Sequence, residues 1–167
     1  MHVGQSDQIR ADVDEQVQAI LDQLELPDDD RSFDCLIGVV ESLYGKRLDI
    51  NPISSPDQHH TGYWIDHDDY GVIMYRKADT ATVQLHTVLH ELVHVVGGHS
   101  GCSARPEAAK AFRNAGGASI ISIRARSVTE GHLSDELQLE EVVAEQGAFA
   151  LARWLRGAGS EAAADIF

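Results

Sequence analysis

One segment, from Thr80 to Val96, limits the possible folds of this chain more than any other. Its apolar residues recur at three- and four-residue steps, which predicts a helix, and the pair Gly97-Gly98 supplies a stop at its C-terminal end. These apolar residues are Leu85, Val88, Leu89, Leu92, Val93 and Val96. They make this the most apolar helix predicted in the chain, so we expect it to lie at the centre of the fold.

The length and composition favour one compact domain. The chain has 167 residues, of which 43% are hydrophobic, enough to build a core without disulfides. We therefore expect a single domain over residues 1–167, with a helix and loop at 1–31. The only cysteines, Cys35 and Cys102, do not form a C-x-x-C pair, which argues against redox work and against a thiolate zinc site.

The charge of the chain bears on its partners and location. Asp and Glu number 27 against 13 Lys and Arg, a formal net charge of -14, so an average surface of this protein would repel a nucleic-acid backbone. The N-terminus lacks the basic and apolar regions of a signal peptide, and no uncharged apolar stretch approaches the ~18 residues that span a bilayer. We expect a cytoplasmic protein that binds neither nucleic acid nor membranes.

The rest of the chain shows both helical and β patterns. Four further helices are predicted near 7–26, 33–44, 106–115 and 134–155. Ser32 and Gly45 are expected to cap the second of these.

Two β-prone runs, Gly62–Ile65 and Gly71–Tyr75, flank the polar segment Asp66–Tyr70 and predict a hairpin. The proline-containing segment that begins at Asn51 and continues through Pro56 is predicted as a loop, and the apolar run Ile120–Ile123 as a strand or hairpin arm.

The central helix carries the sequence His90-Glu91-Leu92-Val93-His94, an H-E-x-x-H motif. Its two histidines are four residues apart, so both imidazoles project from one face of a helix and can bind one metal ion. Glu91 is offset around the helix and can act on a metal-bound water. Two histidines and a glutamate on an otherwise apolar helix would be costly to bury without a partner such as a metal.

Zinc is the metal that this motif indicates. When two neutral imidazoles and a carboxylate hold Zn²⁺, a fourth position remains for water, whose pKa falls toward ~7. Glu91 would then take a proton from that water as the catalytic base and pass it to the leaving amine. The pattern therefore predicts a hydrolase with one zinc ion per chain.

The third protein ligand has to come from another element. Glu140, Glu141 and Glu145 lie on the last predicted helix, where Glu141 and Glu145 share a face. One of these two could bind zinc while the other orients a histidine.

His99 is a rival ligand, because metzincin proteases place a histidine six residues after the second one, but here the interval from His94 is five. His132 and Tyr63 are candidates for stabilising an oxyanion.

With these residues, the sequence resembles the ImmA/IrrE family of zinc metallopeptidases over roughly Phe33 to Leu155. The resemblance lies in the order of a helix, a loop, a strand, the H-E-x-x-H helix and a helix carrying E-x-x-x-F-A, which stands here as Glu145 to Ala150. Val93 departs from the pattern, since a glycine often precedes the second histidine.

The resemblance implies a fold, a ligand set and a function. The fold would be an α+β minimal zincin, with a small sheet packed against helices that include the H-E-x-x-H helix and a C-terminal helix bearing the ligand glutamate. Zinc would be held by His90, His94 and Glu145, with Glu141 beside them. The protein would be a metallo-endopeptidase that cleaves an intracellular regulator such as a helix-turn-helix repressor. The alternative is a non-catalytic zinc-binding regulator or toxin–antitoxin component that acts through protein binding.

Overall fold

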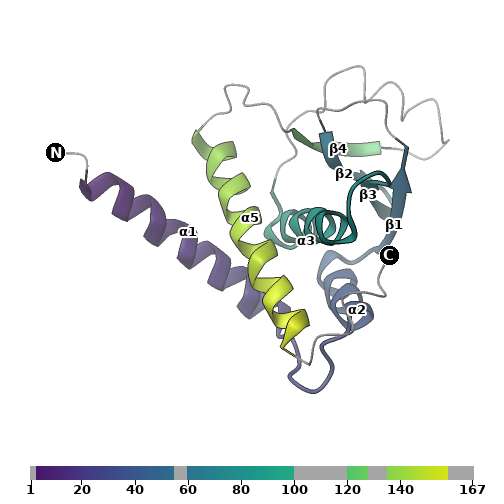
Figure 1. Cartoon of the computed structure of the whole chain (residues 1–167), viewed down its shortest axis with the longest axis horizontal. Coiled ribbons are helices and arrows are strands. Elements are labelled where there is room, and N and C mark those ends of the chain that lie inside the picture. The colour runs from purple at the N-terminus through teal and green to yellow at the C-terminus, as the bar shows by residue number, and fades with distance from the viewer. Residues whose placement is uncertain (1–2, 55–59, 100–119, 128–134, 158–167) are drawn as a thin grey trace.

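The computed structural model of the chain describes residues 3–54, 60–99, 120–127 and 135–157. Over these residues the protein is α+β, as predicted (Figure 1). The helices are α1 (Val3–Leu24), α2 (Phe33–Tyr44), α3 (Ala81–Gly97) and α5 (Asp135–Arg156). The strands are β1 (Arg47–Ile53), β2 (His60–His67), β3 (Tyr70–Arg76) and β4 (Ile120–Ser127). No helix in these ranges combines the length and the apolar character needed to cross a bilayer.

The four strands form one sheet in the order β1-β3-β2-β4. Strands β2 and β3 pair antiparallel, which confirms the predicted hairpin, and β4 pairs antiparallel with β2, so the run that begins at Ile120 is a strand. The predicted helix at 106–115 lies outside the described residues.

The prediction of a loop from Asn51 onward was wrong for its first residues. Asn51, Pro52 and Ile53 belong to β1, which pairs parallel with β3 and places Pro52 opposite Tyr75. Strand β1 is an edge of the sheet, where one side of the backbone needs no partner and a proline is tolerated.

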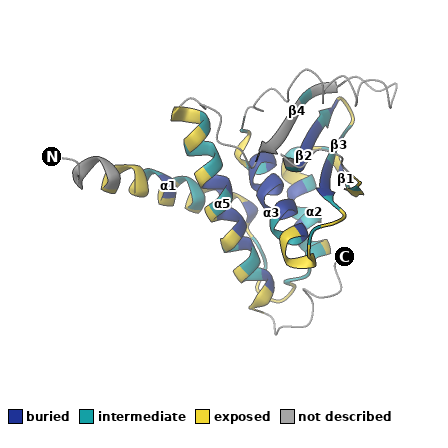
Figure 2. Cartoon of the chain, turned by 45° about the horizontal axis from the view of Figure 1, so that its top comes forward, coloured by how far each residue is buried: buried dark blue, intermediate teal, exposed yellow. Residues whose placement is uncertain are grey.

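Helix α3 is the centre of the fold, as its apolar sequence predicted. It packs against strands β2 and β3 and against helices α1, α2 and α5. Figure 2 shows it as the most continuously buried helix, and Val88, Leu89 and Leu92 have no exposed surface. Helix α1 crosses α5, and α5 packs against both α1 and α3 (Figure 1).

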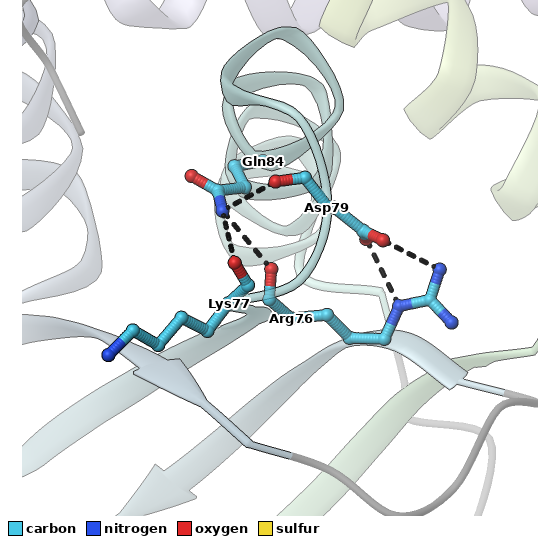
Figure 3. A network of polar contacts seen from close by, with 4 residues as sticks. All are labelled: Arg76, Lys77, Asp79 and Gln84. Atoms are coloured by element: carbon cyan, nitrogen blue, oxygen red, sulfur yellow. Dashed lines mark hydrogen bonds and ion pairs between the residues drawn. The ribbon is translucent and has the colours of Figure 1, made fainter.

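A polar network holds the segment between the end of β3 and the start of α3. The Gln84 side chain donates hydrogen bonds from Nε2 to the carbonyl oxygens of Arg76, Lys77 and Asp79, at 3.3, 3.1 and 2.9 Å (Figure 3). The Arg76 guanidinium in turn binds the Asp79 carboxylate at 2.9 and 3.0 Å. Because Arg76 ends β3 and Gln84 lies in the first turn of α3, these bonds set the direction of the helix relative to the sheet.

Candidate metal centre

The rings of the two motif histidines lie close together on one face of α3. His90 is 2% exposed and His94 is fully buried, and their Nε2 atoms are 2.9 Å apart. The spacing of four residues therefore brings both imidazoles to one place, as predicted from the sequence.

Helix α5 brings a carboxylate to the same place. Glu141 Oε2 is 3.3 Å from His90 Nε2, and Glu141 Oε1 is 3.6 Å from His94 Nε2. One ligand atom from each of the three residues lies within 4.8 Å of the others. His90, His94 and Glu141 thus form a group that could hold a metal ion.

The structure differs here from the prediction, which assigned Glu145 as the third ligand and Glu141 as its neighbour. Glu145 Oε2 lies 3.4 Å from His90 Nδ1, the ring nitrogen on the other side from Glu141, and Glu145 Oε1 lies 3.0 Å from His86 Nε2. The offset of α5 along α3 causes this exchange, because it sets Glu141 opposite the Nε2 atoms and Glu145 one turn further on. Glu140 is not a member of the group.

Glu91 lies between α3 and the sheet. Its side chain is fully buried. A methyl group on Gly62 of β2 would stand 3.3 Å from Glu91 Oε1 and would overlap with the Thr87 side chain. Gly62 therefore lets β2 pass close to Thr87, and with it close to Glu91. The sequence analysis missed this role, whose one sequence signal was a glycine opening a β-prone run.

The remaining candidates lie around the group or away from it. His99 Nδ1 is 2.8 Å from His94 Nδ1, so His99 contacts one histidine of the group but is not a member of it. Tyr63 is buried on β2, next to Gly62, and strand alternation places it on the face of the sheet opposite α3. His132 lies outside the described residues.

Comparison of the chain with protein-family models, with curated proteins and with solved structures found no match. The function proposed below therefore depends on the geometry of this group.

Proposed function

We propose that this protein is a zinc metallopeptidase in which His90, His94 and Glu141 hold the metal and Glu91 is the catalytic base. The observation that carries the proposal is the convergence of two buried imidazoles from α3 and one carboxylate from α5. The proposal keeps the resemblance to the ImmA/IrrE family and its minimal zincin fold, with Glu141 in place of Glu145 as the third ligand.

The spacing of the three donors suits zinc. Zn–N and Zn–O bonds of ~2.0–2.1 Å in a tetrahedral site place neighbouring donor atoms ~3.3 Å apart. The two Nε2 atoms are 2.9 Å apart, and each lies 3.3 or 3.6 Å from a different oxygen of Glu141, so the contacts are on the scale of that value. Two neutral imidazoles and a carboxylate are also the donors of catalytic zinc sites that keep one position open.

The two histidines and the glutamate differ in exposure, which supports a catalytic site over a closed structural one. Both histidines are buried, whereas the Glu141 side chain is 29% exposed. The group is therefore anchored in the core and reaches solvent through Glu141, so we expect a substrate to approach from α5.

Glu91 supplies the proton transfers of the proposed reaction. A zinc ion bound by the three ligands would supply Lewis acidity at the scissile carbonyl and make water more acidic. Glu91 is the neighbour of His90 on α3, and its carboxylate takes up a proton as water attacks and delivers that proton to the leaving amine. Glu91 is not among the three residues whose donor atoms come together, which fits a base rather than a fourth ligand.

The proposed substrate is a segment of an intracellular regulatory protein, such as a helix-turn-helix repressor. Such repressors carry basic DNA-binding surfaces, and a chain with net charge -14 attracts them at long range. Cleavage should then be limited to one or two bonds and slow as salt rises, because ions screen the attraction.

One substitution tests the enzyme directly. Glu91→Gln should keep the zinc content and the melting temperature of the wild type while lowering peptide cleavage at least ~100-fold, the scale of general acid–base catalysis. Glu136→Gln, on an exposed position of α5, is the matched control and should cleave like the wild type. Both variants would be incubated with casein and with a helix-turn-helix repressor encoded nearby.

Three outcomes would each contradict a part of the proposal. Full cleavage by Glu91→Gln would show that Glu91 is not the catalytic base. A full biological effect of Glu91→Gln without any cleavage would favour the alternative, a zinc-binding regulator that acts by protein binding. Rapid digestion of casein with the repressor left whole would overturn only the regulatory substrate.

A further inference from the structure

We propose that His99 is a positioning residue for the metal centre, which accepts a hydrogen bond from Nδ1 of His94 and so directs the Nε2 lone pair of His94 toward the metal. The inference rests on the proposed metal site and assigns a role in it to His99, in the segment that follows α3. It concerns how one ligand is oriented, and it assigns no further ligand.

The ring contact, together with metal binding through Nε2 of His94, would determine the tautomer of each histidine. His94 Nδ1 and His99 Nδ1 are 2.8 Å apart, and one of the two must carry the hydrogen. A neutral imidazole that binds metal through Nε2 carries its hydrogen on Nδ1. His94 is therefore the donor and His99 the acceptor, which puts the hydrogen of His99 on its own Nε2.

The backbone after α3 is shaped to return His99 to His94. Gly98 adopts a left-handed conformation with φ 59°, which ends the helix and turns the chain back. The His99 backbone N–H then donates to the His94 carbonyl oxygen at 3.1 Å. Two hydrogen bonds, one from the backbone and one between the rings, thus join the same pair of residues.

Gly97 provides the space for the returning ring. A methyl group at Gly97 would stand 2.6 Å from His99 Nε2 and 2.9 Å from its two neighbouring ring carbons. The ring lies directly over Gly97, and a side chain there would displace it from His94. Both glycines of the helix stop are therefore required by the His94–His99 contact: Gly98 for the turn and Gly97 for the room.

The two ligand histidines are supported by different partners. His90 Nδ1 faces the Glu145 carboxylate at 3.4 Å, while His94 Nδ1 faces an imidazole at 2.8 Å. A neutral imidazole acceptor adds no negative charge to a centre that already contains Glu141, Glu145 and Glu91. The hydrogen bond to His99 thus orients the His94 ring without adding negative charge beside it.

The test compares a substitution that removes the acceptor with one that keeps an acceptor. His99→Ala removes it, whereas the side-chain oxygen of His99→Asn lies close to the position of Nδ1 and can accept the same bond. We expect His99→Ala to weaken zinc binding by about 10- to 100-fold, the usual effect of losing a partner of a ligand histidine, and His99→Asn to stay within a few-fold of the wild type. Zinc affinity would be measured by competition with a chelator, and the melting temperature of each metal-free variant would check its fold.

A second measurement uses the wild-type protein and no substitution. Ring ¹⁵N chemical shifts should place the hydrogen of zinc-bound His94 on Nδ1 and that of His99 on Nε2. The opposite tautomers, or equal zinc affinity in His99→Ala and the wild type, would overturn the inference. Equal losses in His99→Ala and His99→Asn would also overturn it, because the acceptor would then have no effect. A wild-type protein that binds no zinc would overturn both this inference and the proposed function.

Discussion

Gly147 on α5 lies directly against Val93 on α3, with no room for a side chain between them. A methyl group on Gly147 would stand 2.8 Å from Val93 Cγ2 and 3.0 Å from Cγ1. Val93 is 1% exposed and directly precedes His94, and Gly147 lies between Glu145 and Phe149 on the helix that carries the carboxylates. This contact sets how closely the two halves of the metal centre approach.

Gly147→Ala should therefore destabilise the protein, although alanine is the better helix former. Overpacking a tight core costs about 1–3 kcal/mol, which exceeds the gain of up to ~1 kcal/mol in helix propensity. Urea unfolding of the metal-free protein would measure the change. Val93→Ala introduced into the Gly147→Ala background should recover part of the loss by making room for the methyl group. If the second substitution only adds to the loss, the proposed clash is not the cause.

The same contact explains why the sequence could not show which glutamate faces the two Nε2 atoms. Glu141 and Glu145 are one turn apart on one face of α5, so periodicity makes them equivalent, and the family pattern favoured Glu145. The choice depends on the offset between α3 and α5, which is a property of their packing. The closeness of the His90 and His94 rings was predictable because both residues lie on the same helix, where local geometry alone fixes their separation.

Glu141→Ala should weaken zinc binding more than Glu145→Ala. Glu141 lies opposite the Nε2 atoms of both histidines, so its removal deletes a metal bond. Glu145 lies behind His90, and loss of such a partner typically costs about 10- to 100-fold in affinity. Chelator competition on the two purified variants gives the order. Weaker binding by Glu145→Ala would restore the ligand assignment made from the sequence.

His90→Ala and His94→Ala should each lose the one zinc ion expected per chain. Removing one of three protein ligands takes away a large part of the coordination energy. Metal analysis after dialysis would measure the zinc content. His67→Ala is a suitable control, because His67 is also buried but stacks on Tyr70, with ring centroids 4.4 Å apart, outside the proposed ligand group. Wild-type zinc content in both ligand variants would refute the site.

Tyr44 should make the protein lose stability in alkali. Burial, and after it the hydrogen bond that its hydroxyl donates to Asp66, raises the pKa of Tyr44 above its ordinary value of 10.0. Above pH 10.0 the unfolded chain gives up this proton while the folded protein retains it, so the stabilisation is complete below that pH and is lost as pH rises further.

Tyr44→Phe tests this dependence. The variant should lose about 0.5–1.5 kcal/mol at neutral pH with the hydrogen bond to Asp66, and its stability should fall less steeply than that of the wild type between about pH 9 and about pH 11. Urea unfolding across this range gives both slopes. Lys46 keeps its ion pair with Asp66 at 2.8 Å in either protein, so it contributes equally to the two curves. Parallel curves would show that Tyr44 does not titrate differently in the folded state.

The fold was predictable wherever a local pattern was strong. The helix stripes, the hairpin of β2 and β3 and the caps at Ser32 and Gly45 agree with the sequence, and Ser32 Oγ accepts from the Cys35 backbone N–H at 3.1 Å. Strand β1 was not predicted, and its last residues were predicted as a loop, because Pro52 is a loop signal unless the strand is known to be an edge. Its parallel pairing with β3 is a long-range contact that no local pattern encodes.

Helix α5 packs against both α1 and α3. An ion shared by His90, His94 and Glu141 would act as a cross-link between helices far apart in the chain, and its binding energy would count toward folding. Chelation would then loosen α5 first and leave α1 with less to pack against, while the Gln84 network would still anchor α3 to the sheet. In the metal-free protein α5 and α1 would thus stay packed on α3 but open more often than the half around the sheet, and proteolysis during chelation would begin in these two helices.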